Sequence, residues 1–319
     1  MGINTNLADV KPDIIINYDL SEIESETGVV YVRPESNEVN YEKAILKGVM
    51  PSADVIYMAN LNGALFIKDA LIVEHNACQY RFAIFGKEEM IRYREMAEAF
   101  ENHFNVDFNK AKIVGSFEAI LTLNISSDEL FNTIVPNDRF LYLYGQTIKR
   151  VGDVFVINYD LPAIISRYTP TANIFVIVLR SKEKNFNFKG LSQSITKMIQ
   201  TTDYYDLLDD NIKKNMLPDE MIRRIYHISR NHFMAMCDML DFVFYSNSDQ
   251  ISPNQTTLGH KLIEKGITGQ HIIHIKEYPI KHVIINGERK LIYLNDLPAS
   301  MSIDETVDLI KSIEGLETY

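Results

Sequence analysis

A segment that occurs twice in altered form is the sequence feature that most constrains the fold. Residues 39–58 and 157–177 contain the pairs Asn-Tyr and Ala-Ile, followed by a proline and an alanine, in the same order. Where the two copies differ, the chemistry is kept, as in Glu42 against Asp160. Such agreement indicates a duplicated unit, and each copy predicts a helix, a proline-containing turn and a buried strand.

The regions around the two copies predict a mixed α/β fold. Residues 79–85 form an apolar run that we interpret as a strand, and residues 87–104 carry apolar side chains three and four positions apart, which predicts an amphipathic helix. Residues 112–123 are expected to return to the sheet. We therefore expect two related helix-strand units that form a mixed sheet with flanking helices, together with a small C-terminal hairpin-and-helix module.

Four segments follow from this organisation. They are N-terminal strands over residues 1–38, a first repeat unit over residues 39–150, a second and more helical repeat unit over residues 151–249, and the C-terminal module over residues 250–319. The last boundary is placed in a polar stretch, because such stretches are typical of linkers between periodic segments.

The C-terminal module has the clearest local signals in the chain. Asn286 and Gly287 separate two β-branched runs, and a two-residue hairpin turn requires residues that adopt positive φ at both positions. Further along, Ser302 is followed three positions later by Glu305, the pattern of a capping box at the start of a helix. The sequence therefore predicts a β-hairpin followed by a terminal helix.

Composition and charge narrow the possible partners. The chain has 319 residues, of which 46% are hydrophobic and 24% charged, so it is long and apolar enough to form two or three globular domains. Its formal net charge of -11 repels polyphosphates, and the sequence shows no contiguous basic stripe that would offset this repulsion. We therefore predict no nucleic-acid partner.

The cysteine count and the longest apolar runs indicate where the protein works. The two cysteines, Cys78 and Cys237, both lie in apolar sequence, which argues against a disulfide framework and favours a reducing compartment. No apolar run approaches the roughly 20 residues that a bilayer requires. We expect a soluble protein that does not insert into membranes, located in the cytoplasm, or in the virion if it belongs to a viral assembly.

The common enzyme motifs are missing. The sequence contains neither the Gly-rich phosphate-binding loops of nucleotide enzymes nor the Gly-x-Ser-x-Gly motif of an activated serine, so it nominates no catalytic residue and no cofactor. The histidines also predict no metal site. His271 and His274 are expected on opposite faces of a strand, and His227 and His232 are poorly spaced on a helix.

A ligand site is suggested at the start of the two repeats. Tyr41 and Glu42 in the first copy correspond to Tyr159 and Asp160 in the second, and the two carboxylates could form a pseudo-symmetric pair at the ends of strands. The alternative is structural. Asp160 precedes a proline-containing helix pattern and would cap the free amides of its first turn.

An apolar helix pattern over residues 233–244 suggests either a core element or an interface. Its apolar side chains lie all round the helix, which implies burial on more than one side. The core interpretation places Phe233, Met236, Leu240 and Phe244 on the buried face. Because methionine adapts to varied partners, the interface interpretation nominates a second set of side chains. These interface candidates are Met234, Met236, Met239 and Phe242.

The leading functional hypothesis is a structural or interaction protein that acts in an oligomer or larger assembly, including one of viral or phage type. It rests on the absence of catalytic motifs together with repeated surfaces and a methionine-rich apolar helix. Its partner would be another protein or a second copy of this chain. The alternative is an enzyme or small-ligand-binding protein with a carboxylate-lined site between the two repeat units.

Overall fold

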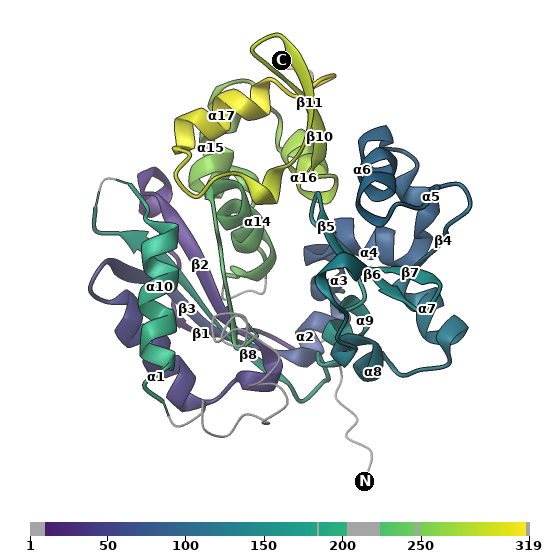
Figure 1. Cartoon of the computed structure of the whole chain (residues 1–319). Helices are drawn as coiled ribbons and strands as arrows, with labels where there is room; N and C mark the ends of the chain where they lie inside the picture. The colour runs from purple at the N-terminus through teal and green to yellow at the C-terminus, as the bar shows by residue number, and fades with distance from the viewer. Residues whose placement is uncertain (1–9, 184, 203–223, 246–248, 317–319) are drawn as a thin grey trace. The chain divides into compact units, whose positions relative to one another are not determined.

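The computed structural model describes residues 10–183, 185–202, 224–245 and 249–316, and it has the mixed α/β fold predicted from the sequence. The chain divides into two compact units (Figure 1). Unit 1 comprises Met1–Leu71, Tyr168–Lys276 and Leu297–Tyr319, and unit 2 comprises Ile72–Arg167 and Glu277–Asp296. Each unit therefore combines stretches from several of the four predicted segments.

Unit 1 is built on a five-stranded antiparallel sheet. In spatial order its strands are β1 (Asp13–Ile16), β3 (Ala53–Asn62), β8 (Asn173–Ser181), β2 (Thr27–Val32) and β9 (Tyr226–Ile228). The central strands β8 and β2 are runs of β-branched residues that are buried on both faces, because helices cover the sheet from both sides.

Three helices form the two outer layers of unit 1. One face of the sheet carries α1 (Val39–Val49) and α10 (Phe188–Ile199), and the other carries α14 (His232–Phe242) (Figure 1). The remaining helices of this unit are short. They are η2 (Leu20–Glu24), η3 (Pro34–Ser36), α2 (Gly63–Lys68), η5 (Pro253–Gln255), α15 (Thr257–Glu264), α16 (Gly269–Glu277) and α17 (Ile303–Lys311).

Helix α14 is buried along its whole length. All of its residues from His232 to Phe242 lie in the interior, so the burial expected for this apolar helix is confirmed. The four interface candidates are among them, with exposed fractions of 7% for Met234, 2% for Met236, 0% for Met239 and 1% for Phe242. Their side chains pack inside unit 1, and a role in binding a partner stays a prediction.

Unit 2 contains a four-stranded mixed sheet and a separate hairpin. The sheet consists of β4 (Lys112–Gly115), β7 (Val154–Ile157), β6 (Gln146–Val151) and β5 (Phe140–Leu143), with β4 and β7 parallel. The hairpin is formed by β10 (Ile280–Ile285) and β11 (Glu288–Tyr293). The helices of this unit are α3 (Leu71–His75), α4 (Ala77–Phe85), α5 (Lys87–Met90), α6 (Arg94–Phe104), α7 (Ser116–Leu123), α8 (Ser127–Asn132), η4 (Asn137–Arg139), α9 (Leu161–Ser166) and η6 (Leu294–Asp296). Its core is rich in phenylalanine.

The predicted hairpin turn and capping box are confirmed. Asn286 and Gly287 have φ angles of 54° and 79°, the positive values that a two-residue turn of this kind requires. Ser302 accepts a hydrogen bond from the amide of Glu305, and the Glu305 carboxylate accepts one from the amide of Ser302. The hairpin lies in unit 2 and the helix in unit 1, and the boundaries of the four predicted segments stay a prediction.

Two segments predicted as strands are helical. Residues 79–85 lie in α4, whose buried side chains Cys78 and Phe82 are four positions apart, as on one face of a helix. Of residues 112–123, only β4 joins the sheet, and the rest forms α7. Both segments are short apolar runs, for which periodicity alone does not separate a strand from a buried helix.

His271 and His274 also lie on a helix, α16, and not on the predicted strand. The buried residues of this helix, Ile272 and Ile275, are three positions apart, which is a helical spacing that the strand interpretation overlooked. Within the described part of the chain, every helix is too short or too polar to serve as a membrane span.

The two repeated segments share an order of elements but not one packed unit. Pro51 follows α1 and precedes β3, and Pro170 lies in the turn between α9 and β8. The strands β3 and β8 are hydrogen-bonded neighbours. However, α1 belongs to unit 1 whereas α9 belongs to unit 2, so the second copy is divided between units. The duplication stays a prediction from the sequence.

Candidate functional site

A pocket in unit 1 lies between α10 and β9, and we call it the basic pocket. It has a volume of about 710 Å³. Its walls are Arg33, seven residues of α10 and its C-terminal end between Phe188 and Gln200, the run Tyr226–Arg230, and Ala299. Small-molecule sites in proteins have volumes of about 300 to 1,000 Å³, so this pocket is large enough for a metabolite.

The apolar period of α10 explains why its polar face is presented to the pocket. Phe188, Leu191, Ile195 and Ile199 are buried against the sheet at helical spacing. The side chains between them consequently face away from the core. The helix begins at Asn187, whose side chain accepts a hydrogen bond from the amide of Gly190 at 2.9 Å and so satisfies one free donor of the first turn.

Four basic side chains line the pocket, and no acidic residue is among its described lining. The basic residues are Arg33, Lys189, Lys197 and Arg230. They come from three places in the chain, namely the end of β2, the outer face of α10 and the segment after β9. In a chain with a formal net charge of -11, this concentration of positive charge makes the pocket attractive to anions.

Arg33 is the most enclosed of these four residues. It directly follows β2 and its amide donates a hydrogen bond to the carbonyl of Ile225 at 2.9 Å, which fixes the backbone at the pocket wall. Its Nε atom is buried and forms no hydrogen bond within the described part of the chain. A buried guanidinium nitrogen is costly unless a partner satisfies it, and a bound anion would provide an acceptor.

Hydroxyl groups hold the strand and the helix of the pocket together. The Tyr226 hydroxyl donates to the carbonyl of Ser192 at 3.2 Å and lies 3.2 Å from Thr196 Oγ1. Tyr226 itself is buried in the core that α10 shares with the sheet. These contacts join the edge strand β9 to α10 beside the pocket.

His227 lies on the wall of the pocket and is held by a buried carboxylate. Its Nε2 atom is 2.9 Å from Asp238 Oδ2, and Ser229 Oγ donates to the same oxygen at 2.7 Å. Asp238 is 0% exposed. The imidazole also stacks on Tyr31, with ring centroids 4.6 Å apart and an interplanar angle of 18°. The ring orientation is therefore fixed from two sides.

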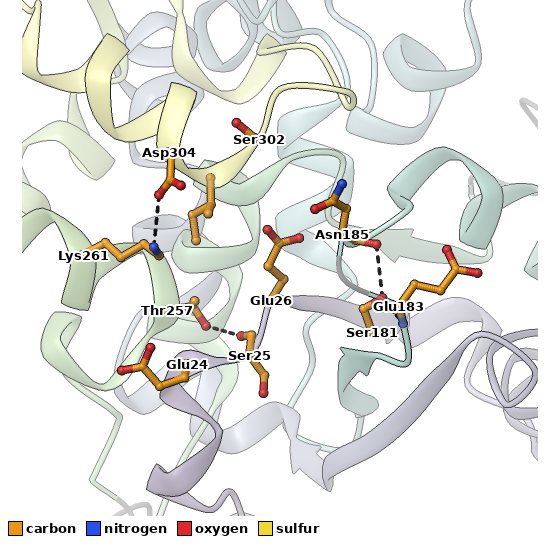
Figure 2. A pocket seen from close by; sticks show the side chains of 11 residues that line it. Glu24, Ser25, Glu26, Ser181, Glu183, Asn185, Thr257, Lys261, Ser302 and Asp304 are labelled. Carbon is orange, nitrogen blue, oxygen red and sulfur yellow. Dashed lines mark hydrogen bonds and ion pairs between the residues drawn. The ribbon is translucent and has the colours of Figure 1, made fainter.

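A second pocket of unit 1 has the opposite charge (Figure 2). It has a volume of about 430 Å³, and its lining includes the carboxylates of Glu24, Glu26, Glu183 and Asp304. Lys261 pairs with Asp304 at 3.0 Å. Glu26 accepts a hydrogen bond from the amide of Phe186 at 2.6 Å. Within the described residues, no three side chains of the metal-binding kinds are grouped closely enough to hold an ion.

The residues predicted as a ligand site are divided between the two units. Tyr41 and Glu42 lie in the first turn of α1 in unit 1, whereas Tyr159 and Asp160 precede α9 in unit 2. Tyr41 is 2% exposed and belongs to the core, and partial burial raises the pKa of Glu42. The paired-carboxylate site stays a prediction.

The expected cap at Asp160 is wrong in its detail. Asp160 precedes α9, but its side chain forms no capping hydrogen bond with the helix. Its φ and ψ angles of -86° and -24° are helical, whereas a capping side chain reaches the first-turn amides from an extended backbone. Two residues earlier, Asn158 adopts a left-handed φ of 52°, and its side-chain amide donates hydrogen bonds to the carbonyl of Gln79 and to Gln146 Oε1.

The sequence analysis did not identify the residues of the basic pocket. It tested His227 only as a metal ligand together with His232. A usable signal was present in the apolar helix pattern, since Asp238 interrupts it, and a carboxylate in a buried helix requires hydrogen-bonding partners. The four basic residues of the pocket gave no signal because they are far apart in the sequence.

Comparison with known proteins gives no relative. No protein-family model, no curated protein and no solved structure matches this chain.

Proposed function

We propose that unit 1 binds a small anionic molecule in the basic pocket, and that this molecule carries a phosphate or a group of similar charge. The observation that supports the proposal best is the lining itself, with four basic residues and no described acidic one in a strongly acidic chain. This accords with the small-ligand alternative drawn from the sequence, but it places the site elsewhere.

The donors around the pocket favour a phosphate over a simple carboxylate. Arginine can bind phosphate oxygens in a bidentate manner, and lysine contributes a compact positive charge. Ser192 and Thr196 are also among the lining residues, and their hydroxyl groups add to the polar side of the pocket. A phosphate has more acceptor oxygens and more charge than a carboxylate, so it can use more of these donors at once.

Isothermal titration calorimetry with inorganic pyrophosphate at neutral pH and low salt tests the proposal. The unaltered chain is expected to bind the probe. Lys189→Glu and Lys197→Glu each replace an exposed cation on α10 with an anion, so each is expected to weaken binding about ten-fold or more. Both side chains are exposed, and the fold is expected to persist, which circular dichroism would verify.

Lys265→Glu is the matched control because it changes the net charge by the same amount. Lys265 is exposed at the end of α15 and does not line the basic pocket. The affinity of this variant for pyrophosphate should equal that of the unaltered chain. Equal losses in all three variants would indicate a nonspecific charge effect and would refute the site.

Self-association is a second candidate function, and it retains the assembly hypothesis drawn from the sequence. The observation that favours it is the edge strand β1, where Ile15 and Ile16 are 54% and 37% exposed. An unpaired strand edge with apolar side chains is a template for pairing. Because this sheet is antiparallel throughout, two β1 strands related by a two-fold axis would continue its pattern.

Light scattering coupled to size-exclusion chromatography tests self-association. A dimer that becomes a monomer in the variant Ile15→Lys would support pairing through β1. Ile284→Lys serves as the control, because Ile284 is a similarly exposed residue (46%) on a strand of unit 2. A monomer at all concentrations of the unaltered chain would exclude this candidate.

A further inference from the structure

We infer that His227 makes anion binding in the basic pocket dependent on pH, with the affinity rising as the histidine becomes protonated. The inference rests on the proposed function, because it concerns the regulation of the same site. It predicts that the protein takes up a proton when the anion binds.

The position of His227 supplies the first argument. The residue is among those that line the pocket, together with its neighbours Ile228 and Ser229. Its ring lies on the α14 side of the edge strand β9, where it contacts Asp238 and Tyr31, so its charge acts on the pocket across this single strand. Arginine and lysine keep their charge across the physiological pH range, whereas histidine gains or loses its charge between about pH 5 and 8. Among the described basic residues of the pocket, His227 is thus the one suited to respond to pH.

The bond to Asp238 allows the ring to change charge without moving. An ionised carboxylate only accepts hydrogen bonds, so Nε2 of His227 carries a hydrogen and donates it to Asp238 whether the imidazole is neutral or protonated. The hydrogen bond from Ser229 and the stacked ring of Tyr31 remain in place in both states. Protonation therefore changes the charge of the wall and not its shape.

Charged groups on every side of the ring set the balance between its two states. From α14, the carboxylate of Asp238 favours the protonated form, and Asp241 lies on the same helix. From β2, Tyr31 stays neutral because burial raises its pKa, and it lies in the field of Arg33 and Glu35. The neighbouring cations favour the neutral form of His227.

The remaining cations of the pocket act in the same direction as Arg33. Lys189 and Lys197 on α10 and Arg230 after β9 line the same cavity as the histidine. A bound anion screens these charges and is itself attracted to the imidazolium. Binding then shifts His227 toward protonation, and by thermodynamic reciprocity protonation strengthens binding by the same factor.

The test uses inorganic sulfate as the probe, because sulfate keeps its two charges over the whole pH range whereas phosphate changes its own. Sulfate binding to the full chain is measured by calorimetry from about pH 5.5 to 8.5, the range in which a histidine titrates. Each titration is repeated in two buffers of different ionisation enthalpy, which gives the number of protons taken up. Circular dichroism confirms that the chain is folded at each pH.

The expected result is an affinity at least about five-fold higher at the acidic end, with net proton uptake in the middle of the range. The variant His227→Gln should bind sulfate with an affinity that no longer depends on pH. His260→Gln is the matched control, since His260 is a partly exposed histidine of α15 that does not line the basic pocket. It should retain the pH dependence of the unaltered chain.

Two failures are distinguishable. If sulfate binds at no pH and pyrophosphate does not bind either, the proposed function fails. If sulfate binds with a constant affinity and no proton uptake, the pocket stands but the role of His227 is refuted. The proton count is measured on the unaltered chain, so this outcome is decisive even if His227→Gln does not fold.

Discussion

Asp160 and Asp238 show how one type of side chain takes on different roles in different surroundings. The sequence around Asp160 predicts a helix cap, yet the residue adopts a helical backbone and its side chain does not cap α9. Asp238 interrupts an apolar helix pattern, and it is fully buried and binds both His227 and Ser229. Local sequence indicates what a side chain can do, but its role is decided by the neighbours that the fold places around it, here His227 and Ser229 from the segment that precedes α14.

His232 leads to a prediction about stability and pH. It is 5% exposed, and burial lowers its pKa, while Glu26 at 3.8 Å acts in the opposite direction. The unfolded chain therefore binds a proton at this residue at a higher pH than the folded chain does, so the free energy of unfolding decreases as the pH falls below about 6.5. Urea unfolding at several pH values gives the slope of the unfolding free energy against pH. The difference in this slope between the unaltered chain and His232→Gln measures the contribution of His232. Identical slopes would contradict the assignment.

Among the helices, strands and turns, the sequence predicts best those whose residue types allow only one local conformation. The positive φ angles of Asn286 and Gly287 follow directly from the residue types, and so does the capping box at Ser302. Residues 79–85 were misassigned because an apolar run fits either a buried strand or one face of a helix. The run forms the buried face of helix α4, and Phe82 is fully buried among the aromatic residues of unit 2.

The edge strand β9 could not be predicted for a related reason. It is only three residues long, and it becomes a strand by pairing with β2, a segment about 200 residues earlier in the chain. The pocket depends on this pairing, because it aligns His227 with Tyr31 and brings Tyr226 to α10. The residues of the site are therefore visible in the sequence, but the pairing of β9 with β2 that brings them together is not.

For the molecule as a whole, net charge is a poor guide to local binding. The formal charge of -11 and the absence of a contiguous basic stripe predict a surface that repels anions. The fold nevertheless collects Arg33, Lys189, Lys197 and Arg230 around one pocket, although they span almost 200 residues of sequence. The net charge describes the average of the whole surface, whereas anion binding depends on the electrostatic potential within the pocket.

The contrast between the negative charge of the whole chain and the positive charge of the pocket predicts how salt affects anion binding. An anion approaching the protein is repelled by the overall negative charge and attracted by the four cations of the pocket. Salt screens interactions beyond about 8 to 10 Å at physiological ionic strength, so the distant repulsion is screened more completely than the contacts within the pocket. The affinity for pyrophosphate should consequently fall only modestly between low and physiological salt. The slope of log affinity against log salt should be smaller in Lys197→Glu than in the unaltered chain, because this variant has lost one cation of the pocket. Lys265→Glu, which carries the same net charge, should keep the original slope, and calorimetry over a salt series would measure all three. An equal reduction of the slope in both variants would show that the overall charge, and not the pocket, governs anion binding.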